Sequence, residues 1–136
     1  MATWSKRSQR VYDTLDPRLQ VLVTRIRDEV TDVSLISGYR DFMEQNSLFE
    51  AGVSTLRWPE SKHNKRPSKA VDLQPYPYPE YEPKLWGSLG YIAGRAHAIA
   101  AEEGFLIRWG GDWDGDGDMT DQQFDDLFHL ELADDT

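Results

Sequence analysis

Two separated stretches of the chain decide its fold, residues 61–72 (SKHNKRPSKAVD) and residues 126–131 (DLFHLE). Each contains most or all of a short expected strand, residues 70–73 in the first and residues 127–132 in the second. Together the stretches supply two imidazoles, one carboxylate ligand and a second carboxylate three residues before a histidine. This combination of side chains is typical of a catalytic zinc site.

The chemistry of a hydrolytic zinc site limits the candidate ligands. Such an ion takes three protein ligands from His, Asp, Glu or Cys and keeps a fourth position open for water, whose pKa then falls to about 7. The chain has no cysteine, so the ligands must be nitrogen and oxygen atoms. His63 and His129 have acidic partners, whereas His97 lies in an alanine-rich helical stretch without a nearby carboxylate. We interpret His97 as structural.

Length and charge exclude several classes of protein. The 136 residues suffice for one compact domain, residues 1–136, and are too few for two ordinary ones. The formal net charge of -9 argues against a nucleic acid or an anionic membrane as a partner. There is no apolar run of about 18 residues and no N-terminal signal peptide, so we expect a soluble chain made in the cytoplasm, without stable membrane association. The lack of cysteine excludes disulfides and thiol chemistry.

The expected elements follow the order of an α+β domain. Asp16 before Pro17 and Asp41 are typical helix starts, and Gly52 and Gly104 are typical helix ends. Four prolines in residues 75–83 predict a surface loop, neither helix nor central strand. Further loops are expected over residues 58–68 and 110–123. Helices are expected over residues 16–26, 41–52 and 85–103, and strands over residues 33–37, 70–73, 105–109 and 127–132.

The last expected strand has two different faces. Leu130 and Leu132 alternate with His129 and Glu131, and successive side chains of a strand point to opposite faces. We therefore expect His129 and Glu131 to face away from most of the apolar side chains.

Taken together, these motifs resemble a known family. A Ser-x-His ending at His63, an Ala-x-Asp ending at Asp72, an Asp-x-x-His-x-Glu beginning at Asp126 and a Gly-Tyr-Arg ending at Arg40 are similar to the VanY-like zinc peptidases. These belong to the LAS group, named for lysostaphin, D-alanyl-D-alanine peptidases and the sonic hedgehog fold. Within the group, the chain most resembles phage endolysins that are L-alanyl-D-glutamate endopeptidases, over residues 33–132. The resemblance implies a small antiparallel sheet with helices packed on it.

The resemblance also implies a role for each of these side chains. It makes His63, Asp72 and His129 the zinc ligands. It makes Asp126 the catalytic carboxylate, which takes a proton from the attacking water and returns it to the leaving amine. It makes Arg40 the residue that stabilises the carbonyl oxygen as negative charge develops on it.

The resemblance says less about Ser61, Glu131 and the spacing between His63 and Asp72. The resemblance places Ser61 in the substrate pocket or in support of the ligands, and it leaves Glu131 without an assigned role. Family members usually separate the first histidine and the aspartate by seven residues, with a glycine between them, whereas His63 and Asp72 are nine apart. Residues 64–67 are similar to a two-residue insertion, which a loop between the two ligands can absorb.

An acidic loop precedes the C-terminal motif. Residues 112–118 (DWDGDGD) match the opening of an EF-hand calcium loop, with oxygen ligands at positions 1, 3 and 5 and glycine at position 6. Position 12 is Gln123 in place of the bidentate glutamate, so a complete EF-hand is not supported. Five aspartates would repel one another without a cation, which favours a calcium site over a solvated acidic loop. The candidate calcium ligands are Asp112, Asp114, Asp116, Asp118 and Asp121.

The sequence therefore predicts a monomeric zinc peptidase, a phage-type endolysin that hydrolyses the L-alanyl-D-glutamate bond of the peptidoglycan stem peptide. Two alternatives stay open: a D-alanyl-D-alanine carboxypeptidase or dipeptidase of the same fold, and a non-enzymatic metal-binding module. Asp126 argues against the module, because a structural zinc site has four closed ligands and no adjacent base. The resemblance further implies action on the cell wall after a holin has permeabilised the membrane.

Overall fold

The computed structural model describes residues 3–120, 122 and 125–134, and two helices come first in it, α1 (Lys6–Tyr12) and α2 (Pro17–Glu29). Ser5 and Asp16 cap these helices, each by accepting a hydrogen bond from a backbone N–H of the first turn. The expected helix start at Asp16 is therefore confirmed. The sequence does not predict α1, because its seven residues are mostly polar.

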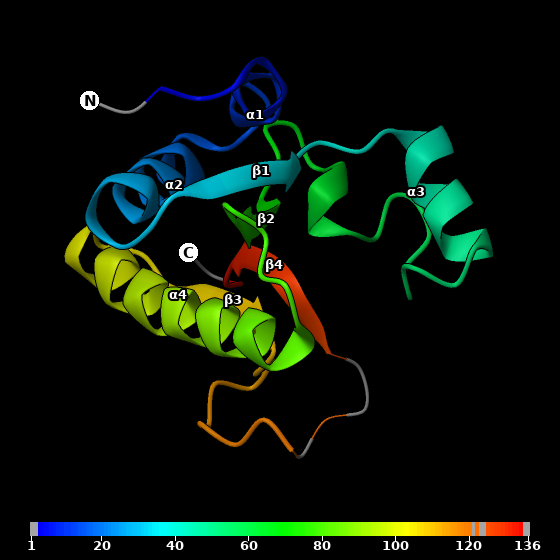
Figure 1. Ribbon diagram of the computed structural model, residues 1–136. Helices are drawn as coiled ribbons and strands as arrows, with labels where there is room; N and C mark the ends of the chain where they lie inside the picture. Colours follow the sequence, from blue (N-terminus) through cyan, green and yellow to red (C-terminus); the bar gives the residue numbers. More distant parts are fainter. Residues whose placement is uncertain (1–2, 121, 123–124, 135–136) are drawn as a thin grey trace.

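Four strands form one small sheet at the centre of the molecule (Figure 1). Every pair of neighbours is antiparallel, and the order across the sheet is β1-β2-β4-β3. The strands are β1 (Val33–Ser37), β2 (Ala70–Pro75), β3 (Ile107–Gly110) and β4 (Asp126–Leu132). The two inner strands, β2 and β4, are thus the ones that carry the two motif stretches.

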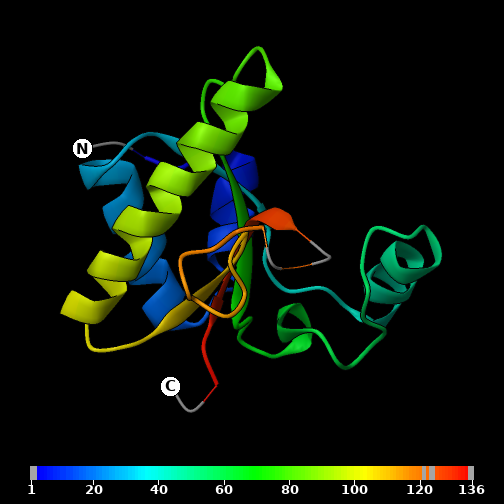
Figure 2. The ribbon, with the colours of Figure 1, turned by 90° about the horizontal axis from the view of Figure 1, so that it is seen from below.

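Helices α2 and α4 (Glu82–Glu102) cover one face of this sheet, as Figure 2 shows from below. The apolar stripe expected in the first part of α2 lies fully buried against the sheet and α4: Leu19, Leu22, Val23 and Ile26. From the sheet, Leu35, Leu73 and Leu130 fill the same core. No helix in the described part of the chain is both long and apolar enough to cross a membrane.

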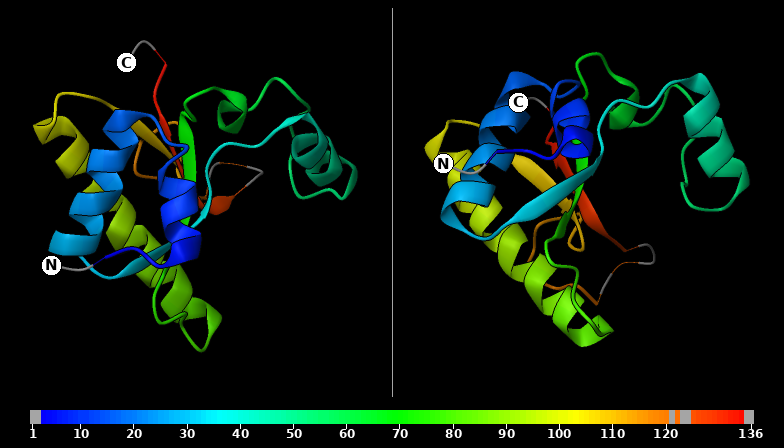
Figure 3. Two further views of the ribbon diagram at one scale, coloured as in Figure 1. Left: turned by 90° about the horizontal axis from the view of Figure 1, so that it is seen from above. Right: turned by 45° about the horizontal axis from the view of Figure 1, so that its top comes forward.

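The other face of the sheet is open, and the chain between β1 and β2 projects from it. This segment holds α3 (Phe42–Glu50) and the short 3-10 helix η1 (Lys62–Asn64), and α3 stands apart from the body in both views of Figure 3. Gln45 is fully buried within the segment, where it donates hydrogen bonds to Ser54 Oγ (2.9 Å) and Leu56 O (2.7 Å). A polar network therefore holds this segment together in place of a large apolar core.

Some expected boundaries are wrong, mostly where proline decides the structure. Pro75 is part of the inner strand β2, which is tolerated because it is the last residue and pairs only with Val33. Helix α4 begins at Glu82 and not at residue 85, because proline fits the first turn of a helix. Strand β3 begins at Ile107 and not at residue 105, and the expected loop over residues 58–68 contains η1.

Candidate metal centre and active site

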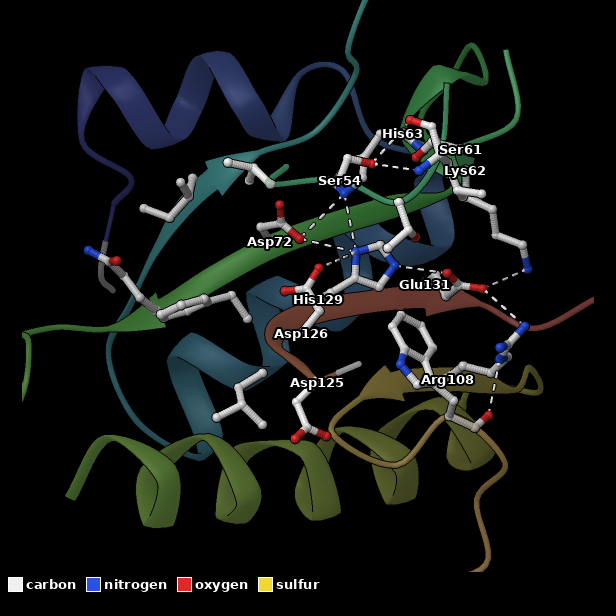
Figure 4. A pocket seen from close by; sticks show the side chains of 18 of the residues that line it. Ser54, Ser61, Lys62, His63, Asp72, Arg108, Asp125, Asp126, His129 and Glu131 are labelled. Atoms are coloured by element: carbon white, nitrogen blue, oxygen red, sulfur yellow. Dashed lines mark hydrogen bonds and ion pairs between the residues drawn. The ribbon is translucent and has the colours of Figure 1, made fainter. Parts of the chain in front are cut away.

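The register of the sheet brings the two motif stretches together. Pairing of β2 with β4 places Asp72 opposite His129, and η1 brings His63 to the same point (Figure 4). His129 Nδ1 lies 3.1 Å from Asp72 Oδ1, and His63 Nε2 lies 3.2 Å from His129 Nδ1 and 3.3 Å from Asp72 Oδ1. All three side chains are buried. His129, more than fifty positions away in sequence, thus meets His63 and Asp72 so that three donor atoms point at one position.

Gly38 sets the orientation of the His63 ring. Its carbonyl oxygen lies 2.7 Å from His63 Nδ1, and a carbonyl can only accept, so Nδ1 carries the proton and Nε2 is free to coordinate. The chain passes so close to the turn after α1 that a Cβ at Gly38 would lie 2.3 Å from Thr14 Oγ1. Glycine at this position therefore lets the backbone hold the ligand ring.

Glu131 sets the orientation of the His129 ring. Its Oε1 lies 2.8 Å from His129 Nε2, so this nitrogen carries a proton and Nδ1 faces His63 and Asp72. Glu131 lies two residues after His129 on the same face of β4, as the alternation predicts, and both side chains point into the pocket in Figure 4. The two histidines thus use different nitrogens toward the shared position.

The three donor atoms fit a tetrahedral zinc ion. Zinc bonds to nitrogen and carboxylate oxygen are about 2.0–2.1 Å long, so neighbouring donors of a tetrahedron are about 3.3 Å apart. The three separations here are 3.1, 3.2 and 3.3 Å. His63, Asp72 and His129 are also a cluster whose ligand atoms all lie within 4.8 Å of one another. This cluster could bind a metal ion.

The close packing of the three side chains shifts the pKa of both His129 and Asp72. Burial disfavours the imidazolium form of His129, yet hydrogen bonds to Asp72 and Glu131 raise its pKa to about 9. Burial likewise opposes the charged form of Asp72, but the neighbouring His63 and His129 hold its pKa far below the ordinary value. These shifts favour the imidazolium form of His129 between Asp72 and Glu131, and a metal ion at this position would replace the Nδ1 proton.

Asp126 lies beside the three donor atoms without being one of them. Its Oδ2 is 4.0 Å from His129 Nδ1, and its side chain is about one-third exposed to the pocket. Burial and the negative charge of Asp72 raise the pKa of Asp126. A carboxylate with a raised pKa next to the reacting position suits proton transfer.

Gly110 fixes the backbone of Asp126. The two residues pair across β3 and β4 at a register shift, and a Cβ at Gly110 would lie 2.0 Å from Asp126 O. The sequence alone does not indicate a role for Gly110, because nothing local distinguishes it from the other glycines of the chain. Only the pairing of β3 with β4 could have revealed it.

Arg40 and Ser61 support the ligands in this structure. Arg40 Nη2 lies 2.7 Å from Asp72 Oδ2, so the guanidinium holds one carboxylate oxygen and leaves Oδ1 for the shared position. Ser61 is buried and caps η1, and its Oγ accepts a hydrogen bond from His63 N (3.1 Å). The predicted oxyanion role of Arg40 and the predicted substrate contact of Ser61 stay predictions.

A cleft of about 1070 Å³ opens over the cluster, and two different segments of the chain form its walls. One wall comes from the segment after α3, with Val53 and Leu56. The other comes from the start of α4, with Leu85 and Trp86, together with Tyr78 from the loop before it. Both walls mix apolar with polar side chains, and the cluster with Asp126 forms the floor, so the cleft can seat an extended chain across the reacting position.

Three of the five candidate calcium ligands in the acidic loop lie close together. Asp112, Asp114 and Asp116 each offer a carboxylate oxygen within 4.8 Å of the others, and Asp112 Oδ1 is buried without a hydrogen-bond partner in the described part of the chain. Asp118 Oδ1 instead accepts hydrogen bonds from the backbone N–H and hydroxyl two residues later. Asp121 and Gln123 lie outside the described residues.

Trp113 joins this loop to the buried cluster, which the sequence did not predict. Its ring lies 5.5 Å from that of His129, centroid to centroid. Arg108 donates a hydrogen bond from Nε to Trp113 O (3.2 Å) and lies over the Trp113 ring. His97, in contrast, lies on α4 and is not part of the cluster.

Comparison with known proteins gives a family and a fold. The family model described as phage L-alanyl-D-glutamate peptidase matches residues 1–133. The crystal structure of the L-Ala D-Glu endopeptidase ChiX of Serratia marcescens is similar, with a TM-score of 0.72 and 24% sequence identity, over 96% of this chain and 89% of that chain. No curated protein matches the chain. The expected LAS-type α+β fold is confirmed.

Proposed function

Because this chain belongs to the phage L-alanyl-D-glutamate peptidase family, we propose that it is a zinc-dependent endolysin whose active site is the cluster of His63, Asp72, His129 and Asp126. Family membership makes the chain a peptidoglycan-cleaving peptidase, and this sets aside the non-enzymatic module. It also favours the L-alanyl-D-glutamate bond over the D-alanyl-D-alanine bond.

The observation that carries the zinc proposal is the spacing of the three donor atoms. Separations of 3.1–3.3 Å match the edge of a zinc tetrahedron, and the ring tautomers leave the facing nitrogens available. When bound, zinc would polarise the scissile carbonyl and lower the pKa of a water molecule to about 7. Three protein ligands leave a fourth position open, as a hydrolytic site requires.

Asp126 is the general base and then the general acid. It would accept a proton from the attacking water and return it to the amine that leaves when the amide bond breaks. Its raised pKa lets it hold that proton between the two steps. Asp126 is the first residue of β4, and its side chain lines the cleft.

Arg40 would stabilise the oxyanion that forms on the substrate carbonyl. Its guanidinium already lies against Asp72 at the edge of the cleft, where a fixed positive charge costs no rearrangement during the reaction. Ser61 would contribute mainly by capping the turn that carries His63, at the lining of the cleft.

We assign a calcium ion to the acidic loop as a second metal. The buried, unpartnered Asp112 Oδ1 and the convergence of Asp112, Asp114 and Asp116 support this assignment. The bound ion would order the loop that carries Trp113 to His129 and leads into Asp126. Activity and melting temperature should therefore both fall with a calcium-selective chelator, and unchanged values of both would refute the assignment.

Replacement of Asp126 tests the assigned chemistry. The Asp126→Asn variant keeps the size of the side chain but not its basicity, so it should bind one zinc ion and lose at least about 100-fold in turnover of purified peptidoglycan. Asp32→Asn, on an exposed residue before β1, is the matched control and should keep full activity. Loss of zinc or retention of turnover in Asp126→Asn would contradict the role.

Mass spectrometry of the digested muropeptides identifies the bond. Cleavage at L-alanyl-D-glutamate leaves L-alanine on the glycan and frees the amine of D-glutamate. Release of free D-alanine would instead indicate the carboxypeptidase alternative.

The enzyme would meet its substrate outside the inner membrane. Its family acts on the cell wall, so a chain made in the host cytoplasm needs a membrane opened by another factor, such as a holin. We also propose that it works as a monomer without a nucleic-acid partner. Light scattering of the purified protein should give the mass of one chain, 15.7 kDa.

A further inference from the structure

A buried ion-pair network lies behind the metal cluster, on the side away from Asp126 (Figure 4). Its centre is Glu131, whose side chain is 10% exposed and whose Oε1 accepts the hydrogen bond from His129 Nε2. The other oxygen, Oε2, lies 3.1 Å from Lys62 Nζ and 3.5 Å from Arg108 Nη1. Glu131 is therefore fixed between an imidazole and two cations.

Lys62 connects two separate parts of the chain in this network. It directly precedes His63 in η1, yet its ammonium group reaches the end of β4, where it also donates to Leu132 O and lies 2.9 Å from Asp134 Oδ1. One side chain thus connects the segment that carries the first histidine to the strand that carries the second. Asp134 is 77% exposed, so the contact with the buried Glu131 is the stronger part of this connection.

We propose that Lys62 is a positioning residue for the metal centre, acting through Glu131 to hold His129 Nδ1 in place. This inference rests on the proposed zinc site. Outer partners that fix a ligating histidine typically change metal affinity by about 10–100-fold when they are removed. Without Lys62, Glu131 keeps only the longer contact to Arg108, and both His129 and η1 lose their shared anchor.

Arg108 is the weaker of the two cations. Its side chain is 38% exposed, its contact with Glu131 is longer, and its Nε is already bound to Trp113 O. Lys62 is 20% exposed and has the shorter contact. Lys62 should therefore carry more of the effect on zinc affinity than Arg108.

The direction of the change in zinc affinity distinguishes a positioning role of Lys62 from a purely electrostatic one. Removal of a positive charge near a cation site should tighten zinc binding if Lys62 acted only through its charge. Loss of a positioning contact should instead weaken it. The two explanations thus predict opposite changes in the same measurement.

The experiment measures the zinc affinity of the full chain by competition with a coloured chelator. Lys62→Met should weaken zinc binding about tenfold or more. Lys65→Met removes an exposed lysine from the same segment and should leave the affinity unchanged. Cobalt(II) spectra report the ligand geometry, and the visible bands should shift in Lys62→Met but not in Lys65→Met.

A double-mutant cycle tests the route through Glu131. Glu131→Gln keeps an acceptor for His129 Nε2 but ends the ion pair, so it should also weaken zinc binding, and adding Lys62→Met to it should have little further effect. If Lys62→Met does not fold, Lys62→Gln, which removes the charge but keeps a polar side chain, takes its place. Full affinity in Lys62→Met or Glu131→Gln, or equal losses that add in the double variant, would overturn the inference. Failure of the unaltered chain to bind zinc would instead overturn the proposed site itself.

Discussion

Replacing Gly110 by alanine tests whether the sheet positions the catalytic carboxylate. The added Cβ would lie 2.0 Å from Asp126 O and 2.8 Å from Asp126 C. Such contacts are not shorter than 3.0 Å in proteins, so the start of β4 must move by about 1 Å. Both clashing atoms belong to the backbone, and no side chain can rotate away to relieve them.

This displacement should affect turnover more than metal binding. A misplacement of about 1 Å near reacting groups can cost about 100-fold in rate, whereas His129 lies three residues further along the strand. Overpacking of this kind also costs about 1–3 kcal/mol in stability. We therefore expect Gly110→Ala to retain one zinc ion, to lose about 100-fold in kcat on purified peptidoglycan, and to unfold at lower urea concentration.

Gly94→Ala is the control for this variant. A Cβ at Gly94 meets no atom within 4 Å, and alanine is the better helix former by about 1 kcal/mol, so this variant should be active and slightly more stable. The reasoning would be refuted if the kcat of Gly110→Ala stayed within twofold of the unaltered chain and its free energy of unfolding within about 0.5 kcal/mol. In that case β3 would not position Asp126 as described.

Three further predictions concern the surroundings of the cluster. Gly38→Ala brings a Cβ to 2.3 Å from Thr14 Oγ1, so urea unfolding should show a loss of about 1–3 kcal/mol and chelator competition should show weaker zinc binding. The metal-free protein should lose up to about 3 kcal/mol at alkaline pH, because the pKa of His129 is about 9 when folded and 6.5 in the ordinary state. This contribution is complete below pH 6.5 and is lost as pH rises through 9, so the urea midpoint must fall over that range, and a flat midpoint would contradict the His129 assignment. Gln45→Leu removes the Nε2 donor to Ser54 Oγ and Leu56 O and the buried acceptor of Asn64 Nδ2, which should cost about 1–3 kcal/mol in urea unfolding. Because Asn64 follows His63 in η1, zinc affinity should fall as well, and an unchanged affinity would show that α3 and the cluster are not coupled.

Local chemistry made several features of this chain predictable. Asp16 and Asp41 cap helices as expected, because a side-chain oxygen at that position meets free backbone N–H groups. Gly52 and Gly104 follow helices with φ of 75° and 88°, a conformation that favours glycine. The two candidate zinc histidines could be selected because the chain has three histidines and no cysteine, whereas Asp72 is predicted as the third ligand only through the resemblance to the VanY-like zinc peptidases.

Features that depend on strand register could not be predicted from the sequence. Gly110 matters only because it lies opposite Asp126, and Lys62 only because its side chain reaches Glu131. By contrast, strand alternation predicts that Glu131 shares a face with His129, where its contact with Nε2 leaves Nδ1 toward the cluster. The contacts of Gly110 and Lys62 join residues that are distant in sequence, and no local pattern encodes them.

Anomalous diffraction at the zinc edge, from crystals of the zinc-loaded protein, tests the central claim most directly. One strong peak is expected about 2.0–2.2 Å from His63 Nε2, His129 Nδ1 and Asp72 Oδ1, with Asp126 beside it and outside bonding distance. A peak bonded to Asp126 in place of one of these ligands, a peak at His129 Nε2, or no peak at this cluster would contradict the account.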